Sequence, residues 1–286
     1  MIHPGLLPAR APETHKGDVG HVFIIAGSVG LTGAAALCSL GALRAGAGLV
    51  TLAIPESLND LMEVKLTEVM TKPFAQTKAR SFSLQALPAL VSVIERMEAV
   101  AIGPGLSQEP QTRQLIRQLL PKVTKPCVAD ADALNAIAED PHLLKKLPGP
   151  MILTPHPGEM GRLIRLSAQD VQRDRERIAT EFAKQYGMVL VLKGHRTIVA
   201  NVDGALYVNE TGNPGMASGG CGDVLTGMIA GLLGQCLSLF DAARLGVYLH
   251  GLAGDLAASQ RGQIGLIASD LLDTIPLAIR QYQSLA

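Results

Sequence analysis

The sequence predicts an α/β protein with one doubly wound, mostly parallel sheet of about eight or nine strands and helices on both faces. Short apolar runs that end in glycine or proline alternate with helical stretches along most of the 286 residues. Apolar residues make up 48% of the chain and charged residues only 17%, which is enough apolar material for a large buried core. No linker, repeat or low-complexity segment divides the chain, so we expect a single domain over residues 1–286.

The expected elements follow an irregular lead-in over residues 1–20. Strands, some of which run on into a loop, are expected at His21–Gly27, Leu49–Pro55, Ala99–Leu106, Pro126–Leu134, Met151–Met160 and Met188–Gly194. Two more runs, RTIVAN and ALYVN, flank an Asp-Gly turn at Asp203–Gly204, which indicates a hairpin. Helices are expected at Gly33–Gly48, Ser57–Val64, Leu84–Arg96, Gln111–Leu120, Ala168–Tyr186, Cys221–Leu233, Leu239–Ser259 and Ala268–Ser284. Only Leu66–Arg80 shows no clear pattern.

The composition excludes several classes of protein. Lys+Arg and Asp+Glu number 25 each, so no basic excess points to nucleic acid. The four cysteines are scattered without metal-ligand spacing, which fits a reducing cytoplasm. The first residues lack the charged start and apolar core of a signal peptide. No uninterrupted apolar run reaches the ~18 residues that a membrane span needs.

The stretch from Asn209 to Gly227, NETGNPGMASGGCGDVLTG, joins a turn-rich loop to the start of an apolar helix. Its glycines bring backbone N–H groups to a helix N-terminus, where unpaired donors and the helix dipole favour an anion. Asp223 would repel phosphate there unless it has a task beside it, such as accepting a proton from an attacking hydroxyl. A plain helix cap is the alternative for Asp223. Three glycines in the four residues 219–222 exceed what a cap needs.

Other unusual loops follow strands, so they should meet at the carboxyl edge of the sheet, where such folds bind ligands. GSVGLTG (Gly27–Gly33) matches the dinucleotide pattern GxGxxG poorly, which favours close backbone packing or a ligand wall. GPG (Gly103–Gly105) is either a turn or a backbone contact to a ligand. Of the two carboxylates that end one strand, Asp130 and Asp132, one could hold Mg²⁺ through water. A helix cap is the better interpretation of Asp132.

The loop TPHPGE (Thr154–Glu159) places His156 between two prolines. Because proline restricts its own backbone and that of the residue before it, the direction of the imidazole is fixed. We therefore favour a substrate contact for His156 over a purely structural role. Glu159 is either an N-terminal helix charge or a ligand that holds Mg²⁺ through water.

The loop KGHRT (Lys193–Thr197) leaves a strand with a cationic tip, and Lys193 or Arg196 is expected to face phosphate. Cys221 lies at the expected start of a helix, a position that lowers the pKa of a thiol. No histidine is placed nearby in the sequence to activate Cys221, so we do not favour a nucleophilic role for it.

Together these motifs resemble the ADP/ATP-dependent NAD(P)H-hydrate dehydratases of the ribokinase-like superfamily. The resemblance is carried by HKGDVGHVFIIAGS, TPHPGEM, VLKGHRT, GNPGMASGGCGDVLTGMIAGLL and VYLHGLAGD, and runs from His15 to the last helix. It implies a mostly parallel sheet without the lid of sugar kinases. It also implies repair of the (6S)-hydrate of NADH or NADPH, with ADP or ATP as co-substrate and Mg²⁺ as cofactor. A homotetramer, and an NAD(P)H-hydrate epimerase as functional partner, are further implications.

The resemblance also implies roles for individual residues. Ala35 at the alanine-rich start of the first helix, Gly105 and His156 would contact the hydrate, and Asp223 would meet its hydroxyl as the base. The nucleotide would be contacted by Lys193, Gly194, His195, Arg196, Thr197, Gly219, Gly220, Cys221 and Gly222. Cys221 stands where the family usually has Ser or Thr, so a backbone role survives there but a hydroxyl role does not. Ser218 likewise replaces a common Thr.

The chemistry of hydrate repair is consistent with these residues even without reference to the family. A hydroxyl on a reduced nicotinamide ring is a poor leaving group, and phosphorylation makes it a good one. The protein must hold the Mg²⁺–nucleotide, accept the hydroxyl proton on Asp223 and stabilise the moving phosphoryl group with the amides of residues 219–222. Two alternatives stay open: a kinase of a small alcohol such as a hydroxymethylpyrimidine, and a non-catalytic nucleotide-binding module. Asp223 beside the glycine loop speaks against the second.

Overall fold

The computed structural model describes residues 5–7 and 10–285, and its centre is a nine-stranded sheet in the order β3-β2-β1-β4-β5-β6-β7-β8-β9. The strands are β1 (His21–Ile25), β2 (Leu49–Pro55), β3 (Met70–Phe74), β4 (Ala99–Ile102), β5 (Cys127–Ala129), β6 (Met151–Leu153), β7 (Val189–Leu192), β8 (Ile198–Ala200) and β9 (Leu206–Val208). From β3 to β7 every pairing is parallel, and β8 and β9 add an antiparallel hairpin at the edge. The predicted mostly parallel sheet is confirmed.

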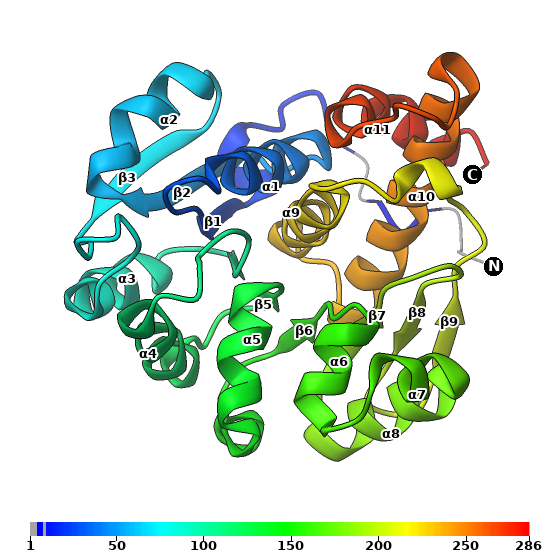
Figure 1. Ribbon diagram of the computed structural model, residues 1–286. Coiled ribbons are helices and arrows are strands. Elements are labelled where there is room, and N and C mark those ends of the chain that lie inside the picture. The colour runs from blue at the N-terminus through cyan, green and yellow to red at the C-terminus, as the bar shows by residue number, and fades with distance from the viewer. Residues whose placement is uncertain (1–4, 8–9, 286) are drawn as a thin grey trace.

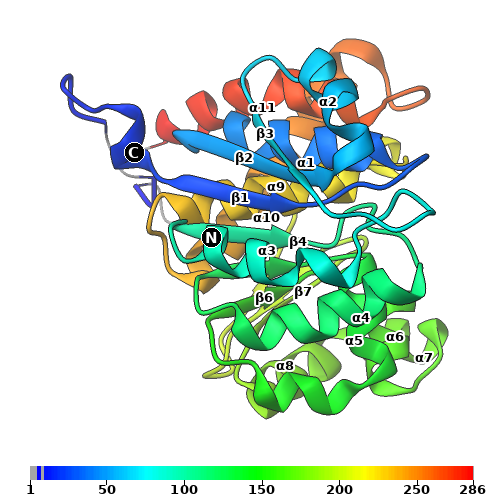
Figure 2. The ribbon, with the colours of Figure 1, turned by 90° about the vertical axis from the view of Figure 1, so that its left-hand side faces the viewer.

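Helices cover both faces of this sheet (Figure 1). They are α1 (Thr32–Arg44), α2 (Asn59–Lys65), α3 (Leu87–Ile94), α4 (Pro110–Leu119), α5 (Asp132–Glu139), α6 (Pro157–Ile164), α7 (Ala168–Arg173), α8 (Arg175–Tyr186), α9 (Cys221–Gly234), α10 (Leu239–Arg261) and α11 (Ala268–Gln283). Short 3₁₀ helices lie at Lys16–Val19, Glu56–Leu58, Leu84–Ala86, Leu120–Lys122, Pro141–Lys146 and Pro214–Met216. Figure 2 shows α1, α2 and α11 on one side of the sheet and α3 to α8 on the other. Along the described chain, no helix combines the length and apolarity needed to cross a membrane.

The side chains of each central strand pack into two separate apolar cores, because successive side chains of a strand point to opposite faces of the sheet. Ile24 belongs to the core under α1, α9, α10 and α11, whereas Phe23 and Ile25 belong to the core under α3 to α8. Both faces of the central strands are buried, as a parallel sheet between helices requires. This explains why the strands read as continuous apolar runs rather than as alternating patterns.

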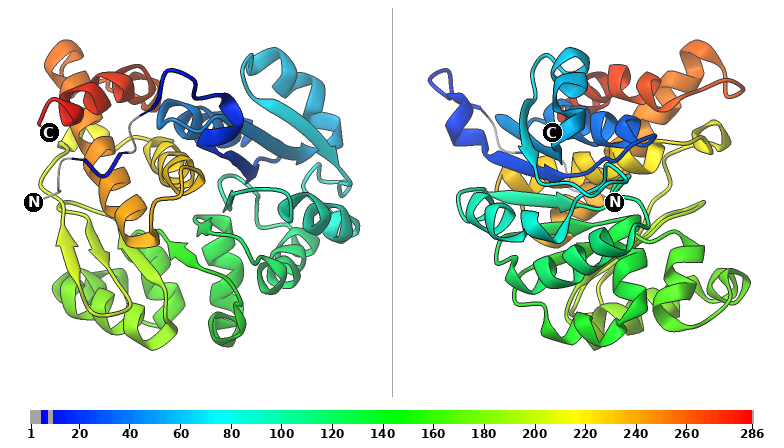
Figure 3. Two further views of the ribbon diagram at one scale, coloured as in Figure 1. Left: turned by 180° about the vertical axis from the view of Figure 1, so that it is seen from behind. Right: turned by 60° about the vertical axis from the view of Figure 1, so that its left-hand side comes forward.

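Small residues let α9 lie directly against α1. The two helices are seen from behind in the left view of Figure 3, α1 in blue and α9 in yellow. A Cβ added at Gly227 would lie 1.9 Å from the carbonyl oxygen of Cys38, and one at Gly231 would lie 2.5 Å from that of Ala42. Both glycines are therefore required by packing between helices. This close approach fixes the position of α9, whose N-terminus carries the glycine-rich loop.

Two stretches differ from the sequence-based expectation. The segment without a clear pattern contains the edge strand β3, whose mostly exposed residues produce no apolar run. The single long helix expected over Ala168–Tyr186 is wrong, because the chain leaves helical geometry at Asp174 (φ −142°, ψ 49°) and forms α7 and α8 instead. The Asp203–Gly204 turn between β8 and β9 is confirmed, with Asn201 N–H donating to Ala205 O at 2.8 Å.

Candidate active site

The loops that leave the parallel strands meet at the carboxyl edge of the sheet, as predicted. The loop after β1 joins the loop after β4, because Gly27 N–H donates to Pro104 O at 2.9 Å. The loop after β7 joins the loop after β6, because Lys193 N–H donates to Pro155 O at 2.8 Å. This edge is where doubly wound sheets bind their ligands.

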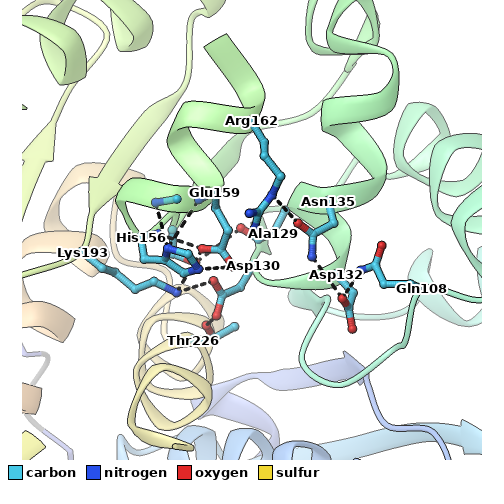
Figure 4. A network of polar contacts seen from close by, with 12 residues as sticks. Gln108, Ala129, Asp130, Asp132, Asn135, His156, Glu159, Arg162, Lys193 and Thr226 are labelled. Atoms are coloured by element: carbon cyan, nitrogen blue, oxygen red, sulfur yellow. Dashed lines mark hydrogen bonds and ion pairs between the residues drawn. The ribbon is translucent and has the colours of Figure 1, made fainter. Parts of the chain in front are cut away.

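A buried ion pair lies at the centre of this edge (Figure 4). Lys193 Nζ is 2.7 Å from Asp130 Oδ1 and 3.8 Å from Glu159 Oε2, and the Thr226 hydroxyl of α9 donates to Asp130 Oδ2 at 2.6 Å. The Asp130 side chain is 2% exposed and that of Lys193 is 18% exposed. Burial alone would lower the pKa of Lys193, but the Asp130 and Glu159 carboxylates outweigh it and raise that pKa. Lys193 therefore stays charged.

The glycines before α9 differ in what they do. Gly220 is the N-cap and has φ +95°, and a Cβ there would lie 2.5 Å from Leu37 Cδ1 on α1. A Cβ at Gly219 would meet nothing within 4 Å, and one at Gly222 would meet only Lys193 Nζ at 3.5 Å. Thus Gly220 shapes the backbone, Gly219 borders open space, and Gly222 borders the space beside the Lys193 ammonium.

The first turn of α9 offers unpaired donors to that space. No side chain caps the helix. Among the described residues, the backbone N–H groups of residues 219–223 have no acceptor. Unpaired N–H groups, the positive end of the helix dipole and the Lys193 ammonium together form a site for an anion.

Asp223 lies in this first turn and is half-buried. Within the described chain its carboxylate accepts no hydrogen bond and forms no ion pair. Burial and then the charge of Asp130 raise the pKa of Asp223 to about 7, while Lys193 opposes the rise. A free carboxylate with a pKa near neutrality is suited to general-base catalysis. The alternative interpretation, in which Asp223 is a hydrogen-bonded helix cap, does not fit, because Gly220 is the N-cap and the Asp223 carboxylate accepts no N–H group of the described residues.

His156 and Glu159 form the N-terminal cap of α6. His156 Nδ1 accepts the N–H groups of Gly158 at 3.0 Å and Glu159 at 3.4 Å, and Glu159 Oε2 accepts the His156 N–H at 2.8 Å. Nδ1 is therefore the unprotonated nitrogen, which leaves Nε2 as the donor. Burial, together with the charges of Lys193 and Arg162, lowers the pKa of His156. His156 thus presents a neutral N–H donor in a fixed direction.

The carboxylates here provide a limited set of metal donors. In the described part of the chain, no group of three or more His, Cys, Asp or Glu side chains is arranged to hold a metal ion. Both Asp130 oxygens are already engaged by Lys193 and Thr226. Glu159 Oε1 is 3.5 Å from His156 Nε2, and the described residues donate no hydrogen bond to it. A nucleotide-bound Mg²⁺ that keeps most of its waters fits this arrangement, because such an ion needs only one or two carboxylates from the protein.

Helix α10 frames the glycine-rich loop with polar groups. His250 Nε2 donates to Cys221 O at 2.9 Å, and the Asp255 carboxylate accepts Gly212 N–H and Asn213 Nδ2 at 2.9 Å each. Burial lowers the pKa of His250 to about 4, so it is a neutral donor at physiological pH. Both residues lie in the motif VYLHGLAGD, where a histidine and an aspartate within an apolar helical stretch indicate polar contacts that local sequence does not specify.

Glycines of α10 make room for the same loop. A Cβ at Gly251 would lie 2.2 Å from Thr211 Oγ1, and one at Gly254 would lie 2.3 Å from Met216 Sδ. The motif HGLAGD is therefore a surface complementary to the loop that precedes α9. Thr226, a polar residue within the apolar part of α9, is a similar indication of a buried polar contact.

Three sequence-based expectations need comment. Cys221 is buried, and burial raises the pKa of its thiol, so the expected lowered pKa is wrong. Asp132 is not the cap of α5; its carboxylate accepts Ser107 N–H at 2.8 Å and so holds the end of the GPG loop. Ala35 is fully buried within α1, whereas Ala34 is half-buried. The contact of Ala35 with the hydrate stays a prediction.

Gly105 and the KGHRT loop follow different strands of the sheet, β4 and β7. Gly105 has φ +63°, and a Cβ there would lie 2.8 Å from Leu31 O, so its backbone packs against the start of α1. Residues 194–196 are exposed. His195 and Arg196 line a surface cavity of about 400 Å³ with Arg173, Asp174, Arg175, Glu176, Ile198 and Val208. The predicted nucleotide contacts of this loop stay predictions.

The fold is that of the ribokinase-like superfamily. A ribokinase-like protein from Enterococcus faecalis superposes with a TM-score of 0.82 at 26% identity, over 96% of this chain and 92% of that one. The chain belongs to the NAD(P)H-hydrate dehydratase family, whose model matches residues 22–277.

Individual relatives agree with this assignment. The bifunctional NAD(P)H-hydrate repair enzyme Nnr of Moorella thermoacetica is 50% identical over 97% of this chain and 52% of its own length. The ADP-dependent (S)-NAD(P)H-hydrate dehydratase of Bacillus subtilis is 36% identical, over 97% of this chain and 95% of its own. The crystal structure of the B. subtilis ADP/ATP-dependent enzyme, co-crystallised with ATP and Mg²⁺, has a TM-score of 0.82 at 35% identity, over 96% and 94% of the chains. The chain thus spans about half the length of the bifunctional relatives that it matches.

Proposed function

We propose that this chain dehydrates the (6S)-hydrate of NADH or NADPH and converts ADP to AMP and phosphate. The observation that carries the proposal is the free Asp223 carboxylate, with a pKa raised to about 7, in the first turn of a helix whose N–H groups are unpaired. Lys193 supplies a permanent positive charge beside it. Family membership supports the choice of substrate.

In this mechanism Asp223 accepts the proton of the hydrate hydroxyl. At the same time the oxygen of that hydroxyl forms a bond to the terminal phosphorus of ADP. The bond between that phosphorus and the bridging oxygen breaks, and AMP leaves with the electron pair. The α9 amides and Lys193 stabilise the charge that moves onto the phosphoryl oxygens. The ring nitrogen lone pair then expels phosphate, and loss of a ring proton restores the dihydropyridine.

Further features belong to the same proposal. Glu159 would hold Mg²⁺ through water, and the ion would supply charge neutralisation to the phosphates. His156 would donate from Nε2 to the hydrate. A functional link to an NAD(P)H-hydrate epimerase is supported by the bifunctional repair enzymes that this chain resembles. A cytoplasmic homotetramer is the proposed state, which light scattering and cell fractionation test.

The experiment is release of phosphate from ADP with and without NADH hydrate, followed together with the recovery of NADH absorbance. We expect both signals to depend on the hydrate and to appear in equal amounts. A phosphorylated product that accumulates without NADH formation would instead support the kinase of a small alcohol. ADP binding without any turnover would support the non-catalytic module.

A further inference from the structure

The break between α7 and α8 gives Arg175 a position that an uninterrupted helix would not. Asp174 leaves helical geometry, and Arg175 becomes the first residue of α8. From there its guanidinium reaches the segment that follows β7. This segment, Leu192–Thr197, includes the KGHRT loop that the proposed function assigns to the nucleotide.

One guanidinium engages three carbonyl groups of that segment. Arg175 Nη2 donates to Leu192 O at 3.0 Å and to Lys193 O at 3.4 Å, and Nη1 donates to His195 O. Gly194 lies between these residues with φ +137°, and a Cβ there would lie 3.2 Å from Nη2. The segment therefore wraps around the guanidinium, and a side chain at Gly194 would crowd it.

Two more carbonyl groups of the loop are also engaged, whereas the N–H groups that follow Lys193 are not. Gly194 O accepts the Thr197 hydroxyl at 3.0 Å, and Thr197 O accepts Asn209 N–H at 2.9 Å. The N–H groups of residues 194–197, in contrast, have no acceptor within the described residues. Consecutive unpaired N–H groups whose carbonyls are turned away are a known way to bind anions.

Arg175 also carries a charge that no acid neutralises. Among residues 5–7 and 10–285, no carboxylate lies within ion-pair distance of it, and its Nε is buried without a partner. Burial lowers the pKa of the guanidinium, and only the more distant Glu176 opposes this. A half-buried arginine that donates to neutral carbonyls leaves its positive charge available to an anion beside the loop.

We propose that Arg175 is a positioning residue for the nucleotide: it holds the carbonyl oxygens of Leu192, Lys193 and His195 away from the site. The N–H groups of the same loop and the Lys193 side chain are thereby kept facing the phosphates. This proposal rests on the proposed binding of an adenine nucleotide at Lys193–Thr197. Arg175 itself touches no substrate in this scheme.

The test compares Arg175→Ala with Arg177→Gln, a control two residues further along α8. Arg177 is exposed and pairs with Asp174 and Glu181, so its loss leaves the loop unchanged. We expect ADP affinity, measured by calorimetry, to fall about 10- to 100-fold in Arg175→Ala, which corresponds to the loss of a charge-assisted hydrogen bond. At saturating ADP, KM for NADH hydrate should stay unchanged. Millimolar guanidinium ion should restore ADP affinity in Arg175→Ala and leave the control unaffected.

A folded Arg175→Ala protein with the ADP affinity of the wild type would overturn the proposal. If Arg175→Ala does not fold, Arg175→Lys replaces it: its single ammonium cannot span three carbonyls, so ADP affinity should fall while Tm stays close to that of the wild type. Wild-type affinity in Arg175→Lys would likewise overturn the proposal. Measurements on the wild type distinguish a failure of the Arg175 proposal from a failure of the proposed function. Without ADP binding or hydrate-dependent phosphate release in the wild type, the proposed function itself fails.

Discussion

Replacing Asp223 with Asn tests the base directly. The substitution keeps size and hydrogen bonding but removes proton acceptance, and loss of a general base typically lowers the rate ~10²–10⁴-fold. The pKa of about 7 adds a signature in the wild type. Below that pKa, kcat/KM should fall about tenfold per pH unit, so that about 1% of the carboxylate is ionised at pH 5. Asp223→Asn should lose this acid limb altogether.

Stability should change in the opposite direction to activity. Because the pKa of Asp223 is raised in the folded protein from its model value of 3.8, the folded state prefers the protonated form. The ionised carboxylate therefore destabilises the fold increasingly as the pH rises from about 4 to about 7, and fully above that. Asp223→Asn removes this penalty, so its Tm should equal or exceed that of the wild type at pH 8. ADP affinity should be retained or improved, because a negative charge near phosphate has gone.

The assay is turnover of NADH hydrate with ADP from pH 5 to 8, beside ADP calorimetry and a melting curve. Asp170→Asn is the matched control, since Asp170 is a first-turn carboxylate on α7 whose side chain is 47% exposed. Near-normal turnover in Asp223→Asn, or an acid limb that persists in it, would refute the assignment of Asp223 as base.

The remaining predictions concern residues around Asp223. Gly222→Val should keep Tm but lower turnover about 10²-fold, because its side chain would enter the open space beside Lys193; kinetics and melting curves check both. Gly220→Ala should instead lower stability by about 1–2 kcal/mol in denaturant unfolding, because φ is +95° there. Asp130→Asn should destabilise the protein by ~3 kcal/mol and move the acid limb of the pH profile to lower pH, because it breaks the Lys193 pair and removes the negative charge that raises the pKa of Asp223. His250→Leu should cost about 1 kcal/mol and reduce turnover, since Cys221 O loses its donor.

Local sequence was enough to predict most of the fold. The buried strands are short apolar runs that end at Gly or Pro, and the Asp203–Gly204 turn has the chemistry of a hairpin. The two failures have local causes as well. β3 is an exposed edge strand without an apolar run, and the break at Asp174 lies in a charged stretch without Pro or Gly.

In the candidate site, too, some features follow from the local sequence and others from residues that are distant in the chain. Asp223 and its glycines are adjacent in the chain, so the sequence by itself determined that a carboxylate would stand at a helix N-terminus surrounded by unpaired N–H groups. Which glycine shapes the backbone and which borders open space was decided by the neighbours Leu37 and Lys193, which lie far away in the chain.

The electrostatics of the site depended on the tertiary structure. Asp130 meets Lys193 across 63 residues and Thr226 across 96, and His250 reaches back 29 residues to Cys221. A raised pKa at Asp223 and the buried thiol at Cys221 arise from burial, which only the packing of α9 against α1 and the sheet creates. Residue types set which groups can titrate or donate, but desolvation and long-range charge pairs set their behaviour, and neither is a property of the local chain.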